Sequence, residues 1–153
     1  MNKMSEDTNS RTVEPLANTW TSGLCDCCDN CDNCSRAIEA CLCYNCQIAR
    51  QYSILRLPRD KQTIGHVDAE MCMFSLILDI IIPTYGSALL LLKMRSLIQH
   101  RYGIGESDVG MDICAVIFCG PCAIMQHDRE MYMHGEDPGS FFESRRNRAV
   151  LLR

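Results

Sequence analysis

The crowding of its cysteines constrains this sequence more than any other feature. Of the 12 cysteines in 153 residues, eight lie between Cys25 and Cys46 and three between Cys114 and Cys122. Thiols one or two residues apart are badly spaced to bridge one another, but a C-x-x-C turn lets both thiolates reach one tetrahedral metal ion. The sequence therefore predicts a small domain whose cysteine loops are held together by metal.

Several cysteine pairs have the spacing of metal ligands. Two such pairs complete a closed four-sulfur site, and zinc is the metal that sulfur ligands in tetrahedral geometry favour. The pairing that joins the two distant blocks uses Cys43–Cys46 with Cys119–Cys122. The spacing leaves open which cysteines share an ion. The candidate zinc ligands are Cys25, Cys28, Cys31, Cys34, Cys41, Cys43, Cys46, Cys119 and Cys122.

The net charge and the absence of known catalytic motifs limit the partners and reactions that we expect for this chain. The net charge of −4 offers no electrostatic basis for nucleic acid binding. The first residues are polar and lack the apolar core of a secretory signal, so we expect a cytoplasmic or membrane-associated chain in a reducing compartment. The sequence has no phosphate loop, dinucleotide fingerprint or hydrolase-like motif, and we expect no catalytic residues and no enzyme activity.

The chain divides into three parts by composition. Residues 1–19 predict a flexible arm, residues 20–133 a cysteine-rich domain, and residues 134–153 a loosely held basic tail. Within the domain we expect a short helix followed by a loop in 47–71, and a helix in 111–133 with Arg129 and Glu130 near its end. The expected fold class is a small, mainly α-helical, metal-stapled domain with irregular loops.

The main apolar run extends from Met71 to Leu92 and contains one charge, Asp79. A helix of this length, at ~1.5 Å per residue, reaches across the ~30 Å core of a bilayer. Insertion is opposed by Asp79, which costs about 3 kcal/mol near the centre of a span, and by Pro83 and Gly86. Three alternatives stay open: a membrane span, a membrane-embedded helical hairpin, and a soluble core helix broken at Pro83.

Cys119-Gly120-Pro121-Cys122 reproduces the C-G-P-C of thioredoxin and indicates redox chemistry as an alternative. Only 31 residues follow Cys122, too few for the strands and helix that a thioredoxin-like fold needs there. We therefore rank the redox enzyme below metal binding. Cys72 and Cys114 lie in apolar runs, and we expect each to be a small buried hydrophobic residue.

Two stretches together resemble the cornifelin and placenta-specific gene 8 family. The first is Trp20-x-x-x-Leu24-Cys25-Asp26-Cys27 followed by Cys41-Leu42-Cys43-Tyr44-Asn45-Cys46-Gln47. The second is Arg101-Tyr102-Gly103-Ile104-Gly105, then Asp112 and Cys119-x-x-Cys122-x-x-x-Gln126-x-x-Arg129-Glu130. The resemblance covers about 20–133 in order. It departs from the family pattern where Leu42 splits a cysteine doublet and Asn45 replaces a proline.

The resemblance implies a small cysteine-rich protein without recognised catalytic chemistry. It implies membrane location, with roles in heavy-metal resistance and organ size in plants, and in the epidermal envelope, growth and differentiation in animals.

From residues and resemblance together, we expect a non-catalytic, zinc-binding, membrane-associated module that acts through protein contacts. One alternative is a homo-oligomeric transporter or channel for divalent or heavy metals, with Asp79 lining the ion path. Another is a structural protein cross-linked through its thiols.

Overall fold

All regular secondary structure in the described part of the chain is α-helical, which confirms the predicted fold class of a small, mainly helical domain. The computed structural model describes residues 19–26, 34–58, 61–62, 65–83, 85–105 and 108–140, without the side chains of 34 and 35. The predicted arm, apart from residue 19, and residues 141–153 lie outside these ranges. The helices are α1 (Cys34–Leu42), α2 (Tyr44–Arg56), α3 (Ala69–Ile81), α4 (Gly86–Tyr102), α5 (Val109–Phe118) and α6 (Gly120–Met133). α1 lies within the first cysteine block, where we expected irregular loops.

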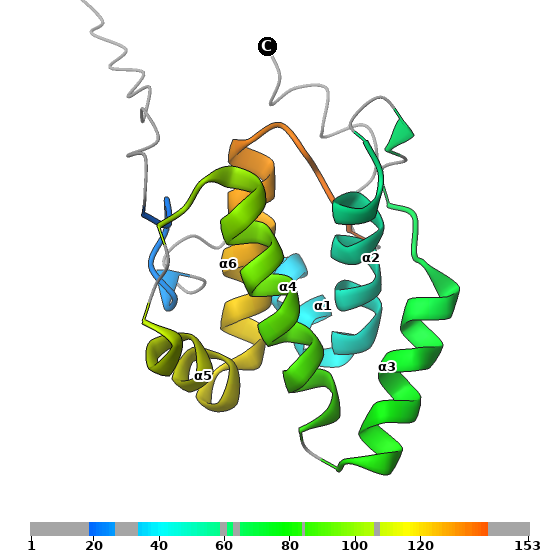
Figure 1. The fold of residues 1–153 in the computed structure, drawn as a ribbon. Coiled ribbons are helices and arrows are strands. Elements are labelled where there is room, and N and C mark those ends of the chain that lie inside the picture. Colours follow the sequence, from blue (N-terminus) through cyan, green and yellow to red (C-terminus); the bar gives the residue numbers. More distant parts are fainter. Residues whose placement is uncertain are drawn as a thin grey trace, which may run out of the picture.

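Three parallel helices form the centre of the molecule (Figure 1). α2, α4 and α6 all begin at the bottom of that view and end at the top, whereas α3 runs down the outside. α2 packs against α3, α4 and α6, and α4 also packs against α3, α5 and α6. The N-termini of the central helices therefore meet at one end of the bundle. We call this the lower end, and it is defined by Tyr44, Gly86 and Gly120.

The apolar run 71–92 is divided between α3 and α4, with a turn at Pro83, whose ring cannot continue a helix. The two helices come very close at Gly86, where an ideal Cβ would lie 2.4 Å from the backbone carbonyl atoms of Leu78. The run is therefore a helical hairpin. The alternative of one continuous spanning helix is wrong, because the chain reverses direction after Ile82.

The segment 109–133 contains two helices where we expected one. α5 and α6 meet at a bend of 115°. Asp108 starts α5 by accepting a hydrogen bond from the Gly110 amide at 3.0 Å. Pro121 lies in the first turn of α6, where its missing N–H is tolerated because that position has no partner within the helix. The bend places Cys119 and Cys122 at the start of a new helix.

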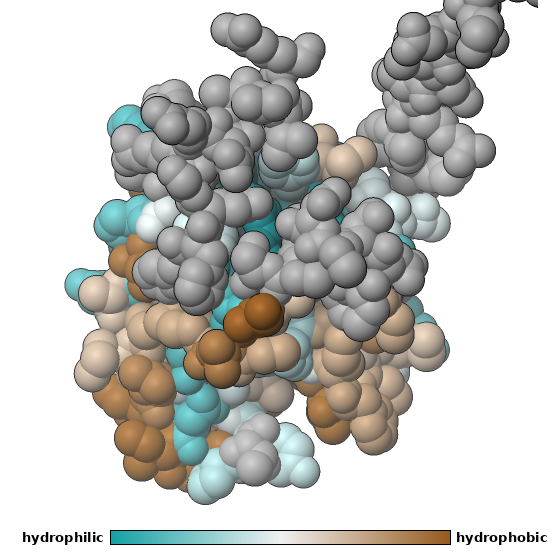
Figure 2. Space-filling view, turned by 180° about the vertical axis from the view of Figure 1, so that it is seen from behind, coloured by the Kyte–Doolittle hydropathy of each residue, from teal (hydrophilic) through white to brown (hydrophobic). Residues whose placement is uncertain are grey.

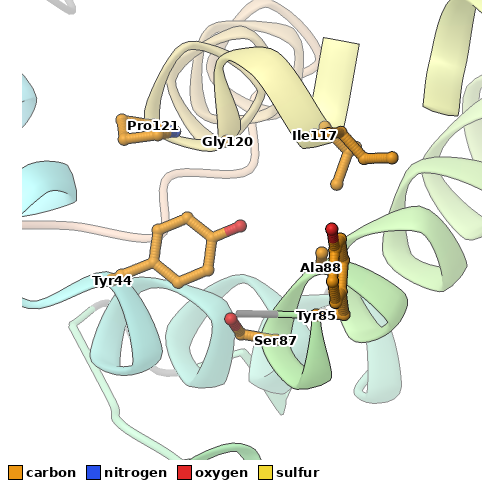
Figure 3. A pocket seen from close by; sticks show the side chains of 8 residues that line it. Tyr44, Tyr85, Ser87, Ala88, Ile117, Gly120 and Pro121 are labelled. Atoms are coloured by element: carbon orange, nitrogen blue, oxygen red, sulfur yellow. The ribbon is translucent and has the colours of Figure 1, made fainter. Parts of the chain in front are cut away.

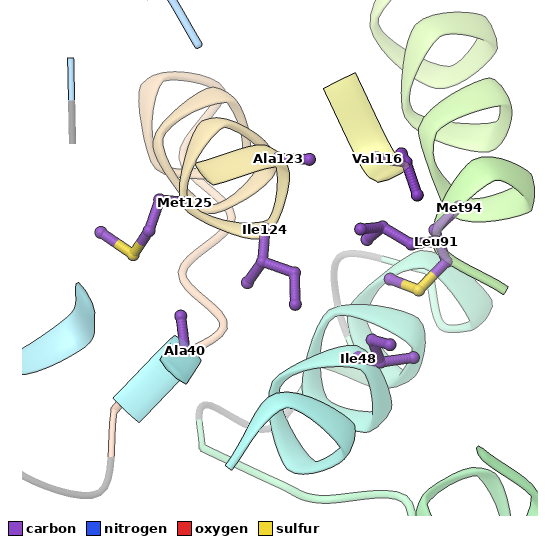
Figure 4. Packing of buried hydrophobic residues seen from close by; sticks show 8 residues of the cluster. All are labelled: Ala40, Ile48, Leu91, Met94, Val116, Ala123, Ile124 and Met125. Carbon is purple, nitrogen blue, oxygen red and sulfur yellow. The ribbon is translucent and has the colours of Figure 1, made fainter. Parts of the chain in front are cut away.

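The apolar core of the bundle lies between α1, α2, α4, α5 and α6 (Figure 4). Its buried members are Ala40, Ile48, Leu91, Met94, Val116, Ala123, Ile124 and Met125. Burying one side chain the size of Leu or Ile contributes about 1.5–3 kcal/mol. This core fixes the mutual positions of the helices and therefore of their N-termini.

The packed region continues beyond Met133 to Ser140. Ser140 Oγ donates a hydrogen bond to Glu39 on α1 at 2.5 Å, and Arg101 on α4 donates to Glu136 at 2.7 Å. Both carboxylates are buried. The segment after α6 thus ties the ends of the bundle together through buried polar contacts, whereas the sequence predicted a loosely held tail from residue 134.

Candidate functional site

Two C-x-x-C pairs stand at the starts of two central helices. Cys43 is the N-cap of α2 and Cys119 is the N-cap of α6, with Cys46 and Cys122 in the following turns. The Cα atoms are 5.4 Å apart in the first pair and 5.2 Å apart in the second, and the sulfur atoms of each pair lie at disulfide distance. The exposed amides and positive dipole end of a helix N-terminus favour the thiolate form of cysteine. The four cysteines that the sequence analysis paired therefore occupy equivalent places in the fold.

Tyr44 connects the two helix starts. An ideal Cβ on Gly120 would lie 2.8 Å from Tyr44 Oη, so the glycine lets the phenol ring lie against the beginning of α6 (Figure 3). Further along the same two helices, Gln51 Nε2 donates to the Ile124 carbonyl at 2.9 Å. These contacts place both cysteine pairs at the lower end.

A cavity of about 420 Å³ opens between these helix starts (Figure 3). Burial, and secondly the negative charge of Asp79, raise the pKa of Tyr44. Its hydroxyl therefore stays protonated at neutral pH and available as a hydrogen-bond donor. The cavity is lined by Tyr44, Tyr85, Ser87, Ala88, Val116, Ile117, Gly120 and Pro121.

Asp79 joins three helices beside this cavity. Its carboxylate accepts hydrogen bonds from the Ser87 amide at 2.7 Å and from Asn45 Nδ2 at 3.2 Å. Asn45 Oδ1 in turn accepts from Ser75 Oγ at 2.5 Å. The first bond satisfies an amide at the start of α4, as an N-cap does. Asp79 thus holds the hairpin together and against α2, and its role in an ion path stays a prediction.

The structure describes two of the other candidate zinc ligands, Cys25 and Cys41. Both are exposed, Cys41 within the last turn of α1 and Cys25 in the segment before that helix. Cys28 and Cys31 lie outside the described residues, as does the side chain of Cys34. In the part of the chain that the structure describes, no three Cys, His, Asp or Glu side chains come close enough together to hold a metal ion. Zinc binding therefore stays a prediction.

A buried polar cluster that residue spacing does not predict lies between α4, α5 and α6. Arg95 donates to Asp112 and, at 2.8 Å, to Gln126 Oε1, and its guanidinium lies 4.1 Å from the ring centroid of Trp20. Gln126 Nε2 donates to the Ser22 carbonyl at 2.7 Å. The cluster fastens the segment before α1 to the bundle. Trp20, Asp112 and Gln126 belong to the family pattern, but their spacing gave no indication that they meet around one arginine.

His127 is completely buried in this cluster. We expect its titration to make the stability of the protein depend on pH. Its ring stacks on Trp20 with centroids 5.6 Å apart, and Arg95 Nη1 lies 3.5 Å from Nε2. Burial, and secondly the charge of Arg95, lower the pKa of His127 to about 3. The unfolded chain, with a histidine pKa near ~6.5, binds more protons between these values. The His127 contribution is therefore complete above pH ~6.5 and decreases as the pH falls towards 3.

We expect wild type to lose more stability between pH 7 and pH 5 than His127→Gln does, in urea unfolding followed by circular dichroism. The exposed His100 supplies the control, and His100→Gln should follow wild type. Equal losses in all three proteins would contradict the assignment.

Large apolar side chains are exposed on the hairpin and on α5. Ile80 is 78% exposed and Phe118 is 85% exposed. Figure 2 shows apolar surface gathered towards the bottom of the molecule, on both sides of the view. Extended apolar surface of this kind indicates a site for a protein partner or a membrane. The further members are Met73, Phe74, Leu76, Ile77, Ile81, Ile82, Tyr85, Leu89, Val109, Met111, Ile113 and Ile117.

Among the described helices, none is long and apolar enough to cross a bilayer by itself. α5 and α6 together meet the length and composition of a span, but the 115° bend separates them. Most residues of α6 are buried inside the bundle, as in the core helix of a folded domain.

The helical fold and the paired cysteines define a cysteine-rich helical domain. Residues 20–130 match the sequence profile of the PLAC8 family, so the chain belongs to that family, and the predicted resemblance to the placenta-specific gene 8 and cornifelin family is confirmed. Neither the curated proteins nor the solved structures include a match to this chain.

Proposed function

We propose that this chain is a non-catalytic module that binds zinc through its paired cysteines, rests on a membrane by its lower end, and acts through contacts with other proteins. One observation carries the proposal: both features occur at the same end of the bundle. The C-x-x-C pairs stand at the starts of α2 and α6, and the hairpin turn and the end of α5 lie at the same end (Figure 1). The hairpin and α5 expose apolar side chains there.

The zinc part of the proposal rests on the chemistry of the cysteine pairs. In the reduced chain, each pair offers two thiolates from one helical turn, which is half of a closed tetrahedral site. The contact between Tyr44 and Gly120 makes the two pairs neighbours in the fold. No three such ligands are close enough together in the described residues to hold an ion. In the zinc-bound protein, the remaining ligands for each pair are therefore supplied by the other pair after a shift of the helix starts, or by the cysteines between 27 and 34. Zinc in such a site ties segments together and contributes to folding directly.

The membrane part rests on the shape of the apolar surface. The exposed apolar side chains of the helical hairpin and of α5 form a surface, and not a single membrane-spanning helix. Such a surface fits a protein that lies in the interfacial layer of a bilayer. The two most exposed large side chains on this face are Phe118, at the end of α5, and Ile80, near the end of α3.

We expect Ile80→Asp and Phe118→Asp each to weaken binding to phosphatidylcholine vesicles by about tenfold or more, because burying one such side chain contributes about 1.5–3 kcal/mol. Cosedimentation with vesicles measures the effect. Met133, which is 51% exposed at the opposite end of α6, supplies the control. If Met133→Asp weakened binding as much, or if wild type did not bind, the lower end would not be a membrane surface.

A thiol-cross-linked structural protein is the second candidate. Cys41 and Cys114 are exposed and accessible for bridges between chains, and the two C-x-x-C pairs lie at disulfide distance. A folded, metal-free protein with disulfides between chains would favour this candidate over zinc binding.

A further inference from the structure

A third sulfur lies beside the Cys43–Cys46 pair. Cys72 stands in the first turns of α3, and its Sγ is 4.0 Å from the Sγ of Cys46. The sequence predicted a small buried hydrophobic residue at this position, but Cys72 is half-buried. A half-buried thiol in contact with a paired sulfur is within reach for thiol–disulfide exchange.

We propose that Cys43, Cys46 and Cys72 form an intramolecular thiol–disulfide exchange site. Cys72 loses its proton, and its thiolate sulfur attacks Cys46 Sγ. The Cys46–Cys72 bond forms while the Cys43–Cys46 bond breaks, and Cys43 leaves as a thiolate that takes up a proton. One disulfide and one thiol are present before and after the step, so no external oxidant or reductant is consumed.

The fold favours Cys43 as the leaving group. Cys43 is the N-cap of α2, where the helix amides and dipole stabilise a departing thiolate. A thiol that is a better acid also leaves faster in exchange. The structure also favours attack on Cys46, because Cys46 Sγ is the sulfur that Cys72 contacts.

The exchange changes which helices are joined. The Cys43–Cys46 bridge lies within one turn, across a sequence separation of 3. The Cys46–Cys72 bridge joins residues separated by 26 and links α2 to α3. It therefore fastens the apolar hairpin covalently to the central bundle. This site operates in the oxidised chain, so it stands independently of zinc binding by the reduced chain.

The test uses the full-length Cys43→Ser variant, in which Cys46 has lost its neighbour in α2. Reduced protein is mixed with oxidised glutathione, quenched with acid at intervals, alkylated and mapped by peptide mass spectrometry. We expect the Cys46–glutathione mixed disulfide to resolve into a Cys46–Cys72 bridge. Resolution should be about tenfold or more faster than loss of the mixed disulfide in Cys43→Ser/Cys72→Ser, because the attacking thiol is held in place.

Cys43→Ser/Cys114→Ser serves as the matched control and should resolve as fast as Cys43→Ser. Circular dichroism checks that each variant is helical, and Cys43→Ala replaces Cys43→Ser if serine disturbs the start of α2. The proposal is overturned if the mixed disulfide persists equally with and without Cys72, or if Cys72 is recovered fully alkylated.

Discussion

Replacing Arg50 by methionine is expected to destabilise the protein by about 3–5 kcal/mol, the cost of removing one partner from a buried ion pair. Arg50 and Glu39 are each 1% exposed, and Arg50 Nη1 donates to Glu39 Oε1 at 2.5 Å. Arg50 Nη1 also donates to the Gly139 carbonyl at 3.2 Å. The substitution removes the Arg50 cation from beside the buried Glu39 carboxylate, together with the hydrogen bond from Arg50 to the segment after α6.

Arg56 provides the control for Arg50 on the same helix. Its side chain is 61% exposed, and its ion pair with Asp68 spans 3.7 Å. Exposed pairs of this kind contribute about 0–1 kcal/mol, so Arg56→Met should change the free energy of unfolding little. Urea unfolding at fixed redox potential measures both variants. Similar losses for the two would show that burial of the Arg50–Glu39 pair is not what holds this part of the fold.

Replacing Gly86 by alanine is expected to cost about 1–3 kcal/mol or more, as overpacking does in well-packed interiors. The added methyl group would lie 2.4 Å from backbone atoms of Leu78, which cannot rotate away as a side chain can. The hairpin must therefore open at its turn, and the hydrogen bond from the Ser87 amide to Asp79 should weaken with it. Faster amide hydrogen exchange in α3 and the first turn of α4 measures this opening.

Gly110→Ala is the matched control for Gly86→Ala, because both glycines lie in the first turn of a helix. The nearest atom to an ideal Cβ at Gly110 is Asp108 Oδ1 at 3.5 Å, an ordinary contact. Alanine also favours helix over glycine by up to about 1 kcal/mol. We expect Gly110→Ala to leave stability unchanged or raise it. Equal stability of the two variants would contradict the close approach at Gly86.

The sequence contained enough to predict helices and the break in the apolar run. Pro83 and Gly86 interrupted that run, and the structure reverses direction there because proline cannot continue a helix and glycine permits backbone contact. Pro121 carried the same kind of signal between α5 and α6. Because Pro121 also fits the redox-like motif Cys119-Gly120-Pro121-Cys122, the sequence predicts one helix in this segment where the structure has two.

The buried charges could not be predicted from spacing. Arg36, Arg50 and Arg95 lie on three different helices, and their partners are distant in the sequence. Arg36 Nη1, for example, donates to Asp128 Oδ2 at 2.6 Å across 92 residues. Which carboxylate meets which arginine depends on the packing of α1 on α2 and α6, and of α4 on α5. An isolated arginine in a helical pattern otherwise indicates a solvated face.

Part of the candidate site could likewise be predicted from the sequence and part could not. C-x-x-C spacing identified Cys43–Cys46 and Cys119–Cys122 as pairs, and the fold places both at helix starts that touch. Spacing gave no indication of Cys72, because its nearness to Cys46 depends on the docking of α3 against α2.

Whether the paired cysteines bind zinc is tested by the metal content of the reduced protein. The full chain is purified under reducing, chelator-free conditions, and bound metal is measured by elemental mass spectrometry, with helicity followed by circular dichroism during chelation. We expect one or more zinc ions per chain, lost together with helicity on chelation. We also expect less bound zinc in Cys119→Ser/Cys122→Ser, and an unchanged amount in Cys114→Ser, whose cysteine lies outside both pairs. A reduced protein that is fully helical and free of metal would contradict zinc binding by the paired cysteines.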